Sequence, residues 1–179
     1  MFVKLRSNFT LGQLPPKHKL VIAGNHDGLL DSKLCARPTD PQTLLTNATY
    51  LIYKTSQLPS MASRYMAVLE LATVARHYMV LSAIPEGDVT TSYMLLNCKI
   101  PEHTSLHSAF SLPRGKALRE HWRAIPTYID VLVTHGPPWG HCDLTCKGYN
   151  VGCKDLLEEV KDRVKPKFHI FGHLHEGMK

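Results

Sequence analysis

Three short apolar runs in the chain each end abruptly in a polar turn. They are residues 19–23 (KLVIA), residues 129–134 (IDVLVT) and residues 168–171 (FHIF), and the turns that follow read GNHD, HGPP and GHLH. A continuous apolar run bounded by turn residues is typical of a strand buried on both faces, as in a sheet covered by helices. The pattern therefore predicts three buried strands, each followed by a polar loop.

Helical patterns precede the second and third of these strands. Residues 115–123 lead into the second strand, and residues 152–164 lead into the third with leucines and valines at helical spacing. Basic residues near the end of the later helix suit its dipole, and Pro166 stops it. Helix, strand and polar loop in repetition predict an α/β fold. In such folds ligands bind beyond the carboxyl ends of the strands, where all three polar turns fall.

The middle of the chain, residues 55–110, does not follow this pattern. Residues 61–81 carry a blurred helical stripe that is compatible with one helix, and residues 82–111 are rich in turn residues. The most apolar stretch, residues 65–84, contains charged side chains, which are costly in lipid and argue against a membrane span. We therefore treat residues 55–110 as a divergent segment of unclear structure.

The polar turns contain side chains that bind metals. Imidazole is a common ligand of zinc, iron and manganese, and the side-chain oxygen of Asn25 is a harder ligand for the same cations. Taken alone, GNHD is explained as a turn with helix-capping residues and HGPP as a stiff loop with an exposed histidine, whereas the two histidines of GHLH seldom arise from packing needs. Together, in this order and each at a strand end, they predict a metal site. His173 and His175 would point to one side of an extended segment, whereas a turn after Gly172 would splay them onto two adjacent metals.

Composition and charge narrow the class of protein. The 179 residues are 44% hydrophobic and 20% charged, which fits one globular domain spanning residues 1–179. The net charge of +6 is dispersed along the chain, so a nucleic-acid-binding module is the weakest of the functions considered. No secretory signal pattern opens the chain, and the cysteine count of five is odd, so we expect a cytoplasmic protein with reduced thiols.

A second metal site is a weaker hypothesis. Cys142, Cys146 and Cys153 lie close in sequence to His141. Their spacing is too loose to be specific for structural zinc.

The three turns in their order resemble the calcineurin-like metallophosphoesterases. The longer segments KLVIAGNHD, LPRGKALREHW, IDVLVTHGPPWG, VGCKDLLEEV and VKPKFHIFGHLHEG are similar to the metallophosphoesterase-domain-containing branch of small phosphodiesterases. The similarity covers residues 13–50 and 112–177. It implies a metallophosphoesterase-type β-sandwich flanked by helices.

The resemblance also implies roles for individual residues. Asn25, His135 and His173 would bind one metal, and His175 would bind the other. His26 would lie near the scissile phosphate, where it stabilises charge or protonates the leaving group. The implied reaction is hydrolysis of a phosphodiester or phosphomonoester by metal-activated water, with two divalent cations (Mn, Fe or Zn) and a small phosphoester or nucleotide as substrate.

The sequence departs from the family pattern before its first shared motif. The family has Asp-x-His and Gly-Asp motifs before GNH, but the 23 residues that precede Gly24 contain no aspartate. The pair Gly87-Asp88 comes later and has the sequence of an ordinary turn. We therefore expect a partial domain, incomplete at both ends, that lacks the bridging carboxylate, binds one metal weakly and turns over little. The alternative is a non-catalytic relative that binds a nucleotide or a protein partner.

Overall fold

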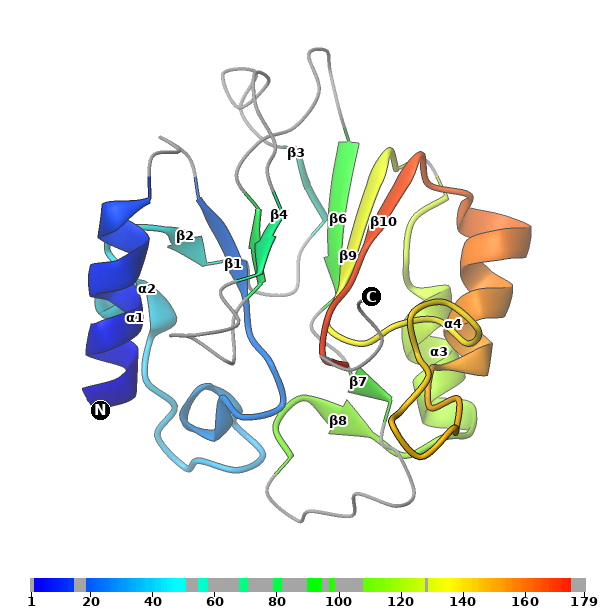
Figure 1. The fold of residues 1–179 in the computed structure, drawn as a ribbon, viewed down its shortest axis with the longest axis horizontal. Coiled ribbons are helices and arrows are strands. Elements are labelled where there is room, and N and C mark those ends of the chain that lie inside the picture. Colours follow the sequence, from blue (N-terminus) through cyan, green and yellow to red (C-terminus); the bar gives the residue numbers. More distant parts are fainter. Residues whose placement is uncertain are drawn as a thin grey trace.

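The computed structural model describes residues 2–14, 19–50, 55–57, 68–70, 79–81, 90–94, 97–98, 108–127 and 129–174. Figure 1 shows helices at two opposite sides of the molecule and the longer strands between them. In chain order the elements are α1 (Phe2–Gln13), β1 (Leu20–Ile22), η1 (Gly28–Leu30), α2 (Pro41–Leu44), β2 (Thr49–Tyr50), β3 (Thr55–Gln57), β4 (Val68–Glu70), β5 (Met79–Leu81), β6 (Thr90–Met94), β7 (Asn97–Cys98), β8 (Ser111–Leu112), α3 (Lys116–Arg123), β9 (Val131–Thr134), α4 (Lys154–Glu158), η3 (Glu159–Val164) and β10 (Phe168–Ile170).

The strands form two four-stranded sheets and one short two-stranded ladder. One sheet has the order β2-β1-β5-β4, the other has the order β10-β9-β6-β3, and β7 pairs with β8. Strands β10, β9 and β6 run parallel to one another, as do β1 and β2. Helices together with parallel strands confirm the predicted α/β class.

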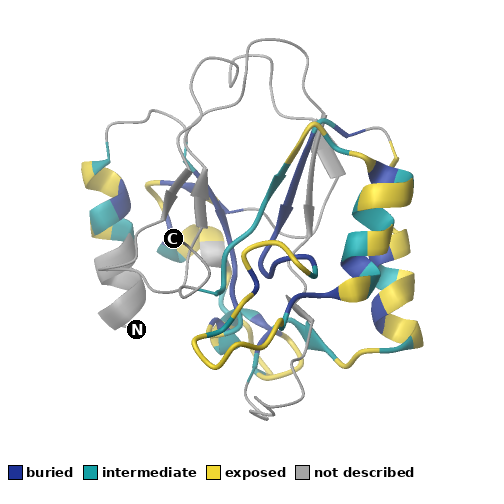
Figure 2. Ribbon diagram, turned by 45° about the vertical axis from the view of Figure 1, so that its right-hand side comes forward, coloured by how far each residue is buried: buried dark blue, intermediate teal, exposed yellow. Residues whose placement is uncertain are grey.

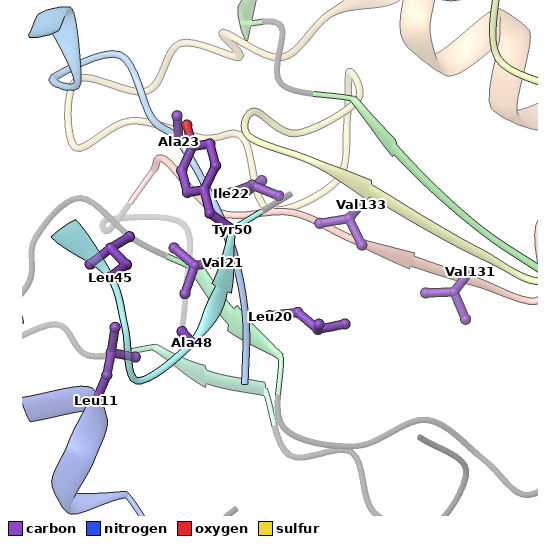
Figure 3. Packing of buried hydrophobic residues seen from close by; sticks show 10 residues of the cluster. All are labelled: Leu11, Leu20, Val21, Ile22, Ala23, Leu45, Ala48, Tyr50, Val131 and Val133. Carbon is purple, nitrogen blue, oxygen red and sulfur yellow. The ribbon is translucent and has the colours of Figure 1, made fainter. Parts of the chain in front are cut away.

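Strand β9 contributes to two separate hydrophobic cores. Val131 and Val133 belong to the buried cluster that also contains β1, whereas Leu132 belongs to the cluster formed with α3 and α4. This alternation follows from the two-residue period of a strand. Figure 3 shows Leu20 and Ile22 of β1 on the side of Val131 and Val133. β9 therefore has apolar neighbours on both faces, which fixes the position of the loop that follows it.

The three strands predicted from the apolar runs are present, but the third is not buried on both faces. All residues of β1 and β9 are buried. β10 is an edge strand, and its Phe168 is 49% exposed. Figure 2 shows the contrast between the dark blue β9 and the teal and yellow β10 beside it. The prediction failed there because an apolar sequence does not distinguish an edge strand from a central one.

The two predicted helices are also present, whereas α1, α2 and the short turn η1 were not anticipated. α3 (Lys116–Arg123) lies within the predicted residues 115–123, and α4 (Lys154–Glu158) continues into the π-helical turn η3 (Glu159–Val164) within the predicted residues 152–164. Arg163 of η3 joins these helices, because its guanidinium donates to the backbone oxygens of Trp122 and Ile125 at 3.1 and 2.6 Å. Leu11 of α1 is buried, but the apolar residues of this helix do not form a clear stripe at helical spacing. The sequence therefore did not predict it.

The helix expected over residues 61–81 is wrong where that segment is described. β4 and β5 lie within it, and they pair with each other in antiparallel register, with β5 also paired to β1. The short runs VLE and MVL are suitable for strands, and sheet pairing overrides a blurred helical stripe. Much of residues 55–110 lies outside the described residues. No helix among the described residues is long and apolar enough to cross a membrane.

Candidate metal centre

A tight turn after β1 presents Asn25 and His26. The turn is closed by the backbone N–H of Asp27, which donates to the carbonyl of Gly24 at 3.1 Å. The Asp27 carboxylate in turn accepts a hydrogen bond from the Gly24 N–H at 2.8 Å. Asp27 is buried, so its charge-assisted hydrogen bond holds the turn strongly. Asn25 and His26 are therefore the two central residues of a braced turn.

The turn brings Asn25 to His135, the first residue after β9. The side-chain oxygen Oδ1 of Asn25 lies 3.1 Å from Nε2 of His135, and the backbone N–H of Asn25 lies 3.4 Å from the same nitrogen. His135 is buried, and its carbonyl accepts a hydrogen bond from the Gly172 N–H at 3.1 Å. Two predicted ligands from motifs 110 residues apart are thus neighbours.

His173 approaches the same place from the loop after β10. The ring centroids of His135 and His173 are 4.8 Å apart, with an angle of 60° between the ring planes. His173 has a φ of 77°, in the left-handed region that non-glycine residues rarely adopt. The backbone at His173 is therefore not extended, unlike the extended segment that the sequence left open for residues 173–175. His175 lies outside the described residues.

The distances suit two ligands of one cation. Ligand atoms about 2.0–2.2 Å from a metal lie roughly 3.0–3.5 Å apart in octahedral or tetrahedral geometry. Nε2 of His135 cannot both accept from the Asn25 N–H and donate to Asn25 Oδ1. If Nε2 carries no proton, it and Asn25 Oδ1 are two hydrogen-bond acceptors that repel each other at 3.1 Å. A cation bound to both atoms would remove this repulsion. The residues present therefore fit a divalent metal.

The ligand set contains no carboxylate among the described residues. No group of three or more His, Cys, Asp or Glu side chains in that part of the chain is placed to hold a metal ion. The candidate centre therefore depends on one amide oxygen and two imidazoles, all neutral. The weaker zinc hypothesis is not supported, because Cys153 is buried in the core beside α4 while Cys142 and Cys146 are exposed.

Two buried carboxylates and one half-buried histidine around the site were not predicted. Asp31 accepts hydrogen bonds from the backbone N–H groups of Lys33 and Phe110, and the Ala109 N–H donates to the carbonyl of Asn25 at 2.8 Å. Asp27 lies near Tyr50, whose pKa is raised first by burial and then by the Asp27 charge. Asp27 belongs to the GNHD motif, but no sequence pattern singles out Asp31. His169 contacts Thr134 at the end of β9 and was not selected from the sequence.

The comparison with known proteins decides the family. The model of the calcineurin-like phosphoesterases matches residues 5–177. The chain belongs to that family. Members generally use divalent metals, in agreement with the donor set at Asn25, His135 and His173.

A human relative carries the name of the branch that the motifs indicated. The chain is 36% identical over 171 residues to metallophosphoesterase domain-containing protein 1 of Homo sapiens, covering 95% of this chain and 48% of the relative. It is 34% identical over 180 residues to UPF0046 protein C25E10.12 of Caenorhabditis elegans, covering 96% and 54%. It is 32% identical over 182 residues to UPF0046 protein T07D4.2 of the same organism, covering 95% and 41%. The chain thus spans about half the length of these relatives.

Within this calcineurin-like phosphoesterase domain, His26 differs in exposure from His135, the histidine that follows β9. His26 is exposed at the tip of the braced turn, whereas His135 is buried. An exposed imidazole beside a metal ligand is accessible to a bound substrate, whereas a buried one is held for coordination. The two histidines thus differ in exposure, and their roles stay predictions.

Proposed function

We propose that this chain carries a metal-dependent phosphoesterase site that acts on a phosphodiester or phosphomonoester. The proposal rests chiefly on one observation, the 3.1 Å approach of Asn25 Oδ1 to His135 Nε2 with the His173 ring beside them. Asn25, His135 and His173 would hold one divalent cation of the manganese, iron or zinc type. His175 would belong to a second metal in the complete domain. A bound cation supplies polarisation of a phosphoryl oxygen and a water molecule of lowered pKa.

The chain's own residues position the substrate around that cation. His26 follows Asn25 directly and is exposed, so its imidazole donates a hydrogen bond to a phosphoryl oxygen or a proton to the leaving oxygen. Asp27 fixes the turn through the Gly24 N–H, so that His26 and Asn25 keep a constant spacing. The left-handed His173 holds its ring against that of His135. Rigid positioning of this kind reduces the entropy that the reaction must lose.

Turnover by this chain is proposed to be low. Three neutral ligands bind a divalent cation less tightly than a set that includes a carboxylate, and the described residues offer no carboxylate in a ligand group. The same observation supports the alternative function, a non-catalytic relative that binds a nucleotide or a protein partner through this site. We propose a cytoplasmic location and a small phosphoester or nucleotide as substrate.

The finer fold is part of the same proposal. The shared cluster of β1 and β9 residues and the helical cluster on the other face of β9 support a β-sandwich flanked by helices. In that arrangement the turns after β1, β9 and β10 meet at one end of the sandwich, where the metal would be held.

Hydrolysis of bis(4-nitrophenyl) phosphate with added Mn²⁺ tests the proposal. We expect slow, Mn²⁺-dependent hydrolysis by the chain, lost in His173→Ala and kept in His121→Ala, which changes a half-buried histidine on α3. Circular dichroism checks that both variants fold. Hydrolysis that survives in His173→Ala contradicts the assignment of the site. Metal-dependent nucleotide binding without any hydrolysis favours the non-catalytic alternative.

A further inference from the structure

A short hydrogen-bond chain runs from β10 to the turn that carries His135. Thr134 Oγ1 donates to the carbonyl of Gly136 at 2.8 Å and lies 2.9 Å from Nε2 of His169. Thr134 is fully buried, with 0% exposure. The parallel register pairs His169 with Leu132, two residues before Thr134, so His169 and Thr134 share one face of the sheet.

The hydrogen count fixes the direction of this chain. A threonine hydroxyl has one hydrogen, and here that hydrogen goes to the Gly136 carbonyl. The contact between Thr134 and His169 therefore needs a hydrogen from the imidazole, which makes Nε2 of His169 the protonated nitrogen. In the other tautomer Nε2 would take the threonine hydrogen, and the buried Gly136 carbonyl would lose this donor.

Hydrogen bonds hold the backbone carbonyls of both His135 and the residue that follows it along the turn, Gly136. Thr134 holds the Gly136 carbonyl, and the Gly172 N–H holds the His135 carbonyl at 3.1 Å. Two successive carbonyls of the turn are thereby fixed while the His135 ring faces Asn25. His169 itself is largely buried, and burial followed by the charge of His141 lowers its pKa to about 4, so it is neutral near pH 7.

We propose that His169 is a positioning residue for His135, acting through the Thr134 hydroxyl on the turn that aims the His135 ring. The effect of this positioning on metal affinity rests on the proposed function. The effect on the structure of the turn does not, because it depends only on hydrogen bonds within the protein. Partners that orient a metal-binding histidine typically change metal affinity by 10–100-fold when they are removed.

Nitrogen NMR tests the tautomer at pH 7. The ¹⁵N shifts of the His169 ring are expected to show a proton on Nε2 and none on Nδ1. A proton on Nδ1 would overturn the proposal, because Thr134 would then donate to His169 and leave Gly136.

Amide hydrogen exchange in the metal-free chain tests the effect on the turn. His169→Leu and Thr134→Val each remove the link, whereas His169→Gln keeps an N–H donor. We expect the Gly172 amide to exchange at least about 10-fold faster in the first two variants, with Leu157 of α4 unchanged and His169→Gln close to the parent chain. Unchanged exchange at Gly172, or equal acceleration at Leu157, would overturn the proposal, since the second result indicates general destabilisation.

Mn²⁺ titration of the same variants tests the effect on the site. His169→Leu and Thr134→Val are each expected to weaken Mn²⁺ binding by about 10-fold, and the double variant by about the same factor, because both act through one link. Additive losses of about 100-fold would contradict a shared link. Should the parent chain bind no Mn²⁺, the proposed function fails, while the Gly172 exchange still decides the positioning role.

Discussion

The backbone N–H of Phe110 donates to a side-chain oxygen of Asp31 at 2.7 Å, across 79 positions of sequence. Phe110 has a φ of 52°, a left-handed conformation that is unfavourable for a bulky residue and needs support from its surroundings. The preceding N–H, that of Ala109, donates to the carbonyl of Asn25. Asp31 thus helps to attach the segment before β8 to the turn that carries the candidate ligand.

Removing the Asp31 carboxylate is expected to destabilise the fold. Asp31→Ala leaves the N–H groups of Lys33 and Phe110 without this acceptor, and hydrogen bonds to a charged group contribute about 1.5–3 kcal/mol each. We predict a loss of roughly 2–4 kcal/mol in the free energy of unfolding, measured by urea denaturation. Asp162→Ala, at an exposed position of η3, is the control and should change stability by less than about 0.5 kcal/mol. Equal effects of the two substitutions would count against the bracing role of Asp31.

Gly152 is expected to tolerate no side chain. A Cβ atom there would lie 2.5 Å from the backbone oxygen of Pro138 and 2.7 Å from Oδ2 of Asp143. Gly152→Ala should therefore lower stability by about 2 kcal/mol or more, because the Pro138 backbone and the buried Asp143 carboxylate must shift. Gly28→Ala is the matched control, since its Cβ would make an ordinary 3.7 Å contact with Leu34 Cδ1. Thermal unfolding of the two variants checks this, and similar melting temperatures would contradict it.

Stability should fall in mild acid because two histidines are held neutral by burial. The pKa values of His169 and His121 are both lowered to about 4, so protons bind the unfolded chain first as the pH falls below about 6.5. The contribution of each is fully present above that pH and is lost between about pH 6.5 and 4. For the more deeply buried His169 the loss between pH 7 and pH 5 is about 2 kcal/mol, and for His121 it is smaller because solvent screens it.

Urea unfolding at pH 7 and pH 5 measures this dependence. The parent chain is expected to lose more stability between the two pH values than His169→Gln, which cannot take up the proton. An equal loss in both proteins would show that His169 is not held neutral by the fold.

Much of the fold could be predicted from local patterns, and the rest depends on pairing. β1 and β9 are buried in the way their apolar runs indicate, because both lie inside their sheets. β10 has a similar sequence but lies at an edge, and edge position depends on which strands surround it rather than on its own residues. β4 and β5 were expected to be helical because their residues alone do not show that β5 pairs with β1.

The candidate site follows the same division. The sequence selects four of the site residues because their motifs follow strands: Asn25, His26, His135 and His173. The contact between Asn25 and His135 was also expected, because loops at the ends of strands lie close together. Thr134 and His169 could not be selected, because their link depends on the β9–β10 register. The roles of these four residues and of His175, and the identities of metal and substrate, stay predictions.

Calorimetric titration with Mn²⁺ tests the central claim most directly, namely that Asn25, His135 and His173 share one cation. The chain should bind one Mn²⁺, and each of Asn25→Ala, His135→Ala and His173→Ala should weaken that binding by at least about 10-fold. His26→Ala, next to Asn25 in the same turn, should retain the parent affinity, because the exposed His26 is proposed to contact substrate and not metal. Undiminished Mn²⁺ binding in the three ligand variants would contradict the account.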